Sequence, residues 1–272
     1  MKKITAVFIA ICCSVSLFGF SNFSLDAGLG YMNYSLFTKY NQEKLHTLNK
    51  ELSEHLALGG TGILQYHSPT STDFYNALNL GLSLKYGLFY ANLNIGLPFE
   101  QIPSGKDPLG DKLKELGATN KLKNSVITDL QLGGGLTILT RIPLTIFVGG
   151  AVAFGYISTN RNLPIEFTNK IKDHHGKPVQ SLMETRTVSM LGLGGDIALK
   201  YYFTKRIGIC FDVKDSIYIV PMSNQRYYTG KDSQGYPFTY RITREKKDDI
   251  GSLVKYTVAN NLTIRLGVAF KF

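Results

Sequence analysis

Eight segments of this chain alternate apolar with polar or small residues, and the connections between them are alternately long and short. The segments are 24–37, 74–86, 88–98, 124–139, 144–157, 185–203, 206–220 and 261–272. The long connections are about 38–73, 99–123, 158–184 and 221–254, and turns of a few residues separate them. A membrane barrel has an even number of strands, short turns at one rim and long loops at the other. The pattern therefore predicts an all-β fold, an eight-stranded antiparallel up-and-down transmembrane β-barrel with four long extracellular loops and short periplasmic turns.

The two faces of the predicted strands differ in a way that indicates which one meets lipid. One face is almost wholly apolar, whereas the other carries charges and many glycines. Soluble barrels point apolar residues inward, and membrane barrels reverse this sense. We therefore expect a lumen in which charges of both signs pair and glycines make room for larger side chains, without a hydrophobic core. The predicted lumen charge network is Asp129, Asp196, Asp212, Lys214 and Arg265.

Aromatic residues gather near the predicted strand ends, where a membrane barrel has its interfacial girdles. One set lies at the end with short turns and the other at the end with long loops. The alternative is that Tyr and Phe simply favour strands. Asp215 departs from the pattern, because strict alternation from Phe211 points it at lipid; a bulge or a position above the apolar band would explain it. The two predicted girdles are Tyr86, Phe89, Tyr201, Phe203, Phe270 and Phe272, and Phe37, Tyr156 and Tyr218.

The amino terminus has the layout of a secretory signal peptide. Lys2 and Lys3 precede an apolar stretch at 4–18 that is too short to span a bilayer as a helix, and Gly19 and Ser21 are the small residues before a cut at Asn22. We therefore predict a cleaved signal peptide at 1–21, Sec-dependent export and a mature barrel domain at 22–272.

The positions of the cysteines favour a cleaved signal peptide over a lipoprotein signal. A lipoprotein signal ending at Cys12 or Cys13 is disfavoured, because neither is preceded by a small residue and the apolar stretch would be cut in half. Cleavage after residue 21 would leave Cys210 as the only cysteine of the chain. We therefore expect no internal disulfide.

The last residues, 268–272, alternate and end on Phe272. Together with the signal peptide and the alternating connections, they resemble the small eight-stranded bacterial outer-membrane β-barrel proteins of the OmpA, OmpX and OmpW types. The resemblance implies a location in the outer membrane of a diderm bacterium, contact with outer-membrane lipids and a monomeric state. It also implies that Phe270 and Phe272 form an assembly signal for the barrel-assembly machinery.

For function, the long loops are the variable part of such a scaffold, and loops on a rigid scaffold commonly bind partners. The connection at 221–254 is rich in basic residues with tyrosines between them, which suggests binding of an anionic host or matrix polymer or of a lipid headgroup. A solvated loop above an anionic membrane is the alternative reading. The candidate loop ligand-binding residues are Arg226, Arg241, Arg244, Lys246 and Lys247.

The sequence also bears on two other functions, a porin and an enzyme. Glycines on the inner face would leave some space in the lumen, so a narrow OmpW-like porin for small or apolar solutes is the main alternative. An enzyme is not expected, because every histidine falls in a predicted loop and no phosphate loop, zinc spacing or nucleotide motif occurs. We expect no cofactor, no metal and no nucleic-acid partner. The histidines are His46, His55, His67, His174 and His175.

Overall fold

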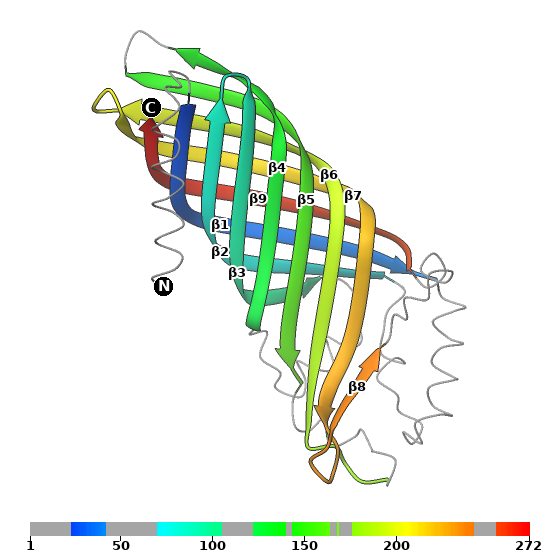
Figure 1. The fold of residues 1–272 in the computed structure, drawn as a ribbon. Coiled ribbons are helices and arrows are strands. Elements are labelled where there is room, and N and C mark those ends of the chain that lie inside the picture. Colours follow the sequence, from blue (N-terminus) through cyan, green and yellow to red (C-terminus); the bar gives the residue numbers. More distant parts are fainter. Residues whose placement is uncertain are drawn as a thin grey trace.

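The structure is a computed structural model, and it describes residues 23–41, 70–104, 122–139, 143–163, 168, 176–241 and 254–272. The predicted signal peptide at 1–21 lies outside these residues. The described chain is almost entirely extended (Figure 1). Its strands are β1 (Phe23–Tyr40), β2 (Thr70–Tyr86), β3 (Phe89–Ser104), β4 (Lys123–Leu139), β5 (Leu144–Asn162), β6 (Ser181–Tyr202), β7 (Ile207–Lys231), β8 (Pro237–Arg241) and β9 (Val254–Lys271).

Eight of these strands close into a ring. Each strand from β1 to β7 pairs antiparallel with the next, β7 pairs with β9, and β9 pairs with β1. The short strand β8 pairs only with the outer part of β7, so it is an addition to the ring. The predicted eight-stranded antiparallel barrel is confirmed.

Several strands run further than the sequence pattern indicated. β1 reaches Tyr40, β3 reaches Ser104, β6 begins at Ser181 and β7 continues to Lys231, all inside segments predicted as loops. The loop boundaries were wrong because the outward face also becomes polar beyond the apolar band, as at Thr187 and Ser189 of β6, so the contrast between the two faces is lost although the inward residues stay buried. A strand needs only about 9–11 residues to cross a bilayer, so β6 and β7 project well beyond it. Figure 1 shows this projection, with β8 beside it, at the end away from the carboxy terminus.

The short connections join the strands at the rim opposite this projection. Gly87 turns β2 into β3 with a positive φ of 58°, a conformation that costs glycine little. Between β6 and β7, the hydroxyl of Thr204 accepts hydrogen bonds from the backbone N–H groups of Arg206 and Ile207 at 3.2 and 2.8 Å. The β4–β5 turn at 140–142 lies outside the described residues. These turns lie at the rim where β9 ends, as predicted for the periplasmic side.

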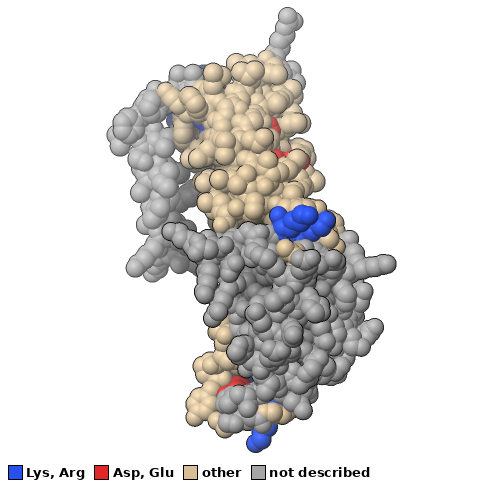
Figure 2. Space-filling view, turned by 90° about the vertical axis from the view of Figure 1, so that its right-hand side faces the viewer, with Lys and Arg blue, Asp and Glu red and all other residues tan. Residues whose placement is uncertain are grey.

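The outer wall of the barrel is apolar and exposed. Leu29 is 69% exposed, Leu80 57%, Leu193 66% and Leu266 63%, which fits lipid contact and would be unfavourable in water. Figure 2 shows one side of this wall as a mostly tan surface, with a group of Lys or Arg side chains at its margin. In the part of the chain that the structure describes, no helix is long and apolar enough to cross a membrane.

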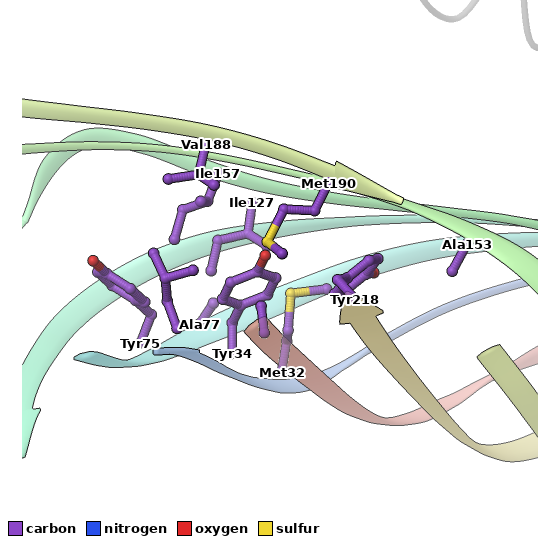
Figure 3. Packing of buried hydrophobic residues seen from close by; sticks show 12 residues of the cluster. Met32, Tyr34, Tyr75, Ala77, Ile127, Ala153, Ile157, Val188, Met190 and Tyr218 are labelled. Carbon is purple, nitrogen blue, oxygen red and sulfur yellow. The ribbon is translucent and has the colours of Figure 1, made fainter. Parts of the chain in front are cut away.

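The lumen contains two apolar clusters, contrary to the expectation of an interior without a hydrophobic core. The larger one, whose packing is shown in Figure 3, lies in the outer half of the barrel, and the smaller one lies near the periplasmic rim. The expectation was wrong because the inner faces of the strands become apolar above the charged level, as at Met32 and Leu36 on β1. The larger cluster is Met32, Tyr34, Leu36, Tyr75, Ala77, Ile127, Ala153, Ile157, Val188, Met190, Tyr218 and Ala259; the smaller is Tyr90, Phe147, Ala198, Cys210 and Ala269.

Candidate functional site: a charge network in a filled lumen

The centre of the lumen holds an ion-pair network around Asp212. Arg265 donates from Nε and Nη2 to Oδ2 of Asp212 at 2.9 and 2.6 Å. Lys214, two residues along the same face of β7, donates to Oδ1 at 2.5 Å, and its Nζ also lies 3.7 Å from Asp196. The strand register explains the first pair, because Asp212 and Arg265 are direct partners in the β7–β9 ladder. Two cations thus compensate one deeply buried carboxylate.

Asp129 is stabilised by hydrogen bonds instead. Its Oδ1 accepts from the hydroxyl of Tyr218 at 2.6 Å and of Ser216 at 3.3 Å, and its Oδ2 accepts from Asn94 at 3.3 Å and Gln131 at 3.4 Å. These donors come from β3, β4 and β7, so they surround the carboxylate from both walls. A buried charge with several donors is far less costly than one without partners.

Closer to the periplasmic rim, ion pairs cross from one wall to the other. Lys200 on β6 pairs with Asp26 on β1 at 2.6 Å. Lys85 on β2 lies 3.6 Å from Asp196 on β6 and 3.4 Å from the centre of the Phe147 ring. Below these groups a cavity of about 320 Å³ opens at the rim. These contacts therefore join different walls of the barrel above the cavity.

Above the outer apolar cluster lies a second polar layer that the sequence reasoning missed. The guanidinium of Arg186 on β6 pairs with Asp73 on β2 and donates to Thr38 on β1 at 2.7 Å, and Gln101 on β3 donates to Asp73 at 3.0 Å. These residues sit in or beside segments predicted as loops. Continued alternation past the predicted strand ends, with a charge on the inner face, was the signal that could have found them.

A further ion pair in this outer region joins Arg161 on β5 to Glu184 on β6 at 2.5 Å. The two residues are direct partners in the β5–β6 ladder. Both are buried, although both lie in a segment predicted as a loop. The inward polar face therefore continues into the part of the sheet that projects from the membrane.

All five residues of the predicted lumen network are buried on the inner face. The structure brings four of them into direct or shared contact: Asp212 with Lys214 and Arg265, and Lys214 with Asp196. Asp129 joins them indirectly, because Gln131 donates to Asp129 and also accepts from Asn92, which donates to Asp196. Ion pairs of the described residues that the sequence reasoning did not name include Lys200 with Asp26, Lys85 with Asp196, Arg186 with Asp73 and Arg161 with Glu184.

Two aromatic residues of the predicted assembly signal lie at the periplasmic rim. Phe270 faces outward on β9 and is 36% exposed. The ring centre of Phe272 lies 5.5 Å from that of Phe23, and its N–H donates to the Phe23 carbonyl at 3.0 Å. Tyr218, predicted in the outer girdle, is instead buried in the lumen against Asp129. That prediction was wrong because Tyr218 shares the face of Asp212, and the alternation of β7 holds to this point.

The predicted loop ligand-binding residues are described only in part. Arg226 lies on β7 opposite Arg186 of β6, and Arg241 lies on β8 opposite Tyr227 of β7. Arg244, Lys246 and Lys247 lie outside the described residues, as do all five histidines. Among the residues that are described, no group of three or more His, Cys, Asp or Glu could hold a metal ion.

The closed strand ring, the exposed apolar wall and the polar lumen define the class: this chain is an outer-membrane β-barrel protein. Residues 15–272 match the model of the family described as a domain of unknown function, DUF2715, and the chain belongs to that family. No curated protein matches the chain.

Solved structures of other outer-membrane proteins are similar to it. A major outer membrane protein from Thermus thermophilus matches at 14% identity with a TM-score of 0.43, over 90% of this chain and 99% of that one. Neisserial surface protein A matches at 10% identity and 0.35, over 92% and 97%. The outer membrane protease OmpT from Escherichia coli matches at 9% identity and 0.39, over 93% and 98%. Because these scores lie below 0.5, the fold is assigned from the strand pairing and the faces described above.

Proposed function

We propose that this protein is a closed-lumen scaffold in the outer membrane that binds an extracellular ligand through its projecting sheet and loops. The supporting observation is the filling of the lumen. Arg265, Lys214, Tyr34, Tyr75 and Tyr218 are among the largest side chains, and each is at most 2% exposed. Side chains this tightly enclosed fit a supporting core better than a water-filled passage.

The projection supplies the surface for binding. β6 and β7 pair from Tyr202 and Gly208 at the periplasmic rim to Ser181 and Lys231 at the far end, with register shifts near Met190, so the pairing extends through and beyond the membrane. β8 widens this ladder, and the β7–β8 turn is held by Asp232, whose carboxylate accepts from the N–H groups of two turn residues at 2.9 and 2.8 Å. A rigid arm of this kind presents its loops at a fixed height above the bilayer.

The ligand class follows from the basic residues of this arm. Arg226 and Arg241 are carried by β7 and β8, and the segment after β8 supplies Arg244, Lys246 and Lys247. A cluster of Lys and Arg attracts sulfated or phosphorylated polymers, and its binding weakens with salt. We therefore propose an anionic host or matrix polymer as the ligand.

Heparin is a suitable probe for this binding. Refolded protein in detergent would be captured on immobilised heparin at low salt, and the variant with all five residues changed to Gln should bind at least tenfold more weakly. A matched control, Lys205→Gln with Arg206→Gln on the periplasmic turn, should bind as the parent does. Equal binding by all three proteins would contradict the proposal.

One observation favours the alternative, a narrow OmpW-like passage for apolar solutes. β7 pairs with β9 only up to Tyr218 and Ala259, although β7 continues to Lys231. Above that level a hydrogen bond of 3.2 Å from Asn224 to Thr257 crosses the separated strands, next to the larger apolar cluster. Single-channel recording and uptake of an apolar probe into vesicles distinguish the two functions. The scaffold proposal expects neither conductance steps nor uptake.

A further inference from the structure

The apolar outer wall is interrupted by a polar patch that the function proposed above does not use. We define the wall patch as Asn33, Asn76, Glu100, Asp215 and Asn260. Direct ladder partners point to the same face of a sheet, and Asn33, Asn76 and Glu100 are successive partners across β1, β2 and β3. Asp215 and Asn260 continue the patch on β7 and β9, where a hydrogen bond of 2.7 Å joins them. The patch therefore covers five neighbouring strands of the ring.

The wall patch lies inside the apolar band of the wall. Leu29 and Leu80 lie below it, at 69% and 57% exposure, and Ile217 and Ile219 lie above Asp215 at 52% and 59%. Asp215 is about eight residues from the periplasmic end of β7, which at ~3.4 Å per residue and a tilt of ~40° places it roughly 20 Å above that end. The apolar band of such barrels is about 25 Å tall, so the patch lies near the headgroup level of the outer leaflet.

Among the described residues, no cation compensates the negative charge of the patch. Oδ1 of Asp215 accepts from Asn260, and Oδ1 of Asn76 accepts from Asn33 at 2.9 Å and from the hydroxyl of Tyr31 at 2.5 Å. Within the described ranges, neither Asp215 nor Glu100 has an ion-pair partner, although every charged group of the lumen shown above has one or is surrounded by donors. A carboxylate beside hydrocarbon is costly without a counter-charge, so a cation is expected to approach from the membrane.

A shallow trough leads from Asp215 down the wall. Gly195, Gly150 and Gly134 follow Asp215 as successive ladder partners on β6, β5 and β4. A Cβ at Gly150 would meet nothing within 4 Å, so the backbone there is open to the membrane. Ridges of exposed Leu, Val and Ile border the row, at Leu132, Val152 and Leu193 on one side and Leu136, Val148 and Ile197 on the other. Three strand spacings of ~4.8 Å give the trough a length of roughly 14 Å, enough for much of an acyl chain.

From these observations we propose that the wall patch is a binding site for an amine-bearing phospholipid of the outer leaflet. The primary ammonium of a phosphoethanolamine headgroup pairs with Asp215 and donates to the amide oxygen of Asn260, and one acyl chain lies along the glycine trough. The headgroup supplies both the missing positive charge and N–H donors. Glu100 strengthens the attraction from the β3 side.

Charge complementarity favours this occupant over a second copy of the chain. A second copy would bring the same carboxylates to the contact, and like charges placed together are destabilising. Lys39 is a described cation on the wall above the patch, but it already contacts an aromatic ring, because its ammonium lies 5.8 Å from the centre of the Tyr256 ring. The carboxylates of the wall patch would likewise repel a lipid whose headgroup is anionic and has no amine.

The test is retention of single lipids measured by native mass spectrometry. Full-length refolded protein would be placed in bilayers of phosphatidylethanolamine with phosphatidylglycerol, or of phosphatidylcholine with phosphatidylglycerol, and then released with mild detergent. The parent should retain one phosphatidylethanolamine per barrel, and phosphatidylcholine, which has no N–H to donate, should be retained at least fivefold less. Asp215→Asn should lower phosphatidylethanolamine retention at least fivefold, and Gly150→Leu should lower it by filling the trough.

The control variant is Asp232→Asn, which removes the same charge in the β7–β8 turn and should retain lipid as the parent does. Heat-modifiable gel migration establishes that each variant is folded. Equal retention by the parent and folded Asp215→Asn would overturn the proposal. So would a dimer that disappears in Asp215→Asn, because the patch would then be a contact between copies.

Discussion

Replacing Arg265 by Met tests whether the lumen network holds the barrel together. The change removes two charge-assisted hydrogen bonds to Asp212 and one of 2.7 Å to Ser83. Removing one partner of a buried ion pair generally costs about 3–5 kcal/mol, because the remaining charge is left without compensation. Lys214 still contacts Asp212 in the variant, so we expect the lower end of this range, about 3 kcal/mol, or roughly a hundredfold in the folding equilibrium constant.

The assay is reversible urea unfolding of the refolded protein in lipid vesicles, followed by heat-modifiable migration and intrinsic tyrosine fluorescence. The double variant Asp212→Asn with Arg265→Met should lose at least about 1 kcal/mol less than the sum of the two single changes, because the residues are directly coupled. Lys271→Met, an exposed residue at the end of β9, serves as a control and should change stability by at most about 0.5 kcal/mol. Additive losses at Asp212 and Arg265 would refute the reasoning.

Three further changes probe other parts of the barrel. Tyr218→Phe removes the 2.6 Å hydrogen bond to Asp129 and should lower the free energy of unfolding by about 1–3 kcal/mol in the same urea assay; no loss would mean that Asp129 does not depend on it. Gly28→Ala would bring a Cβ within 2.5 Å of a backbone carbonyl oxygen of β9 and should impair folding, whereas Gly150→Ala, with nothing within 4 Å, should fold like the parent when gel migration is compared. Deletion of Phe272 should reduce insertion into the outer membrane of living cells more than refolding in detergent, and normal insertion of the truncated protein would count against an assembly signal.

The strand ring and its two faces could be predicted because two independent patterns agreed. Period-two alternation placed Asp129, Asp196 and Asp212 on one face, and the alternation of connection lengths decided that this face is the lumen. A shift of one residue would send every side chain of a strand to the opposite face, so the register is strongly constrained wherever the two faces differ. The inward positions of Lys214 and Arg265 follow from the same alternation.

Contacts across the lumen could not be predicted in this way. Alternation says that Lys85 and Lys200 point inward, but not that they meet Asp196 and Asp26 on other walls, because that depends on the stagger of the closed ring. The apolar layer around Tyr34 was missed for a related reason. An inner face that becomes apolar resembles the lipid face, and only closure of the ring shows that these residues pack against each other.

The ion pairs that cross the lumen have a consequence for the order of assembly. Lys200 and Asp26 belong to β6 and β1, and Arg186 and Asp73 belong to β6 and β2, so partners are far apart in the chain. The β6–β7 hairpin contains the pairs of Lys214 with Asp196 and Asp212, but Lys200 and Arg186 of the same hairpin have their partners on β1 and β2. A β6–β7 hairpin that entered hydrocarbon alone would therefore bring unpaired ions with it. Insertion should accordingly be concerted, with the first and last hairpins meeting before the barrel leaves the aqueous side. A stalled intermediate should expose its charged face to water, where a protease could cut it.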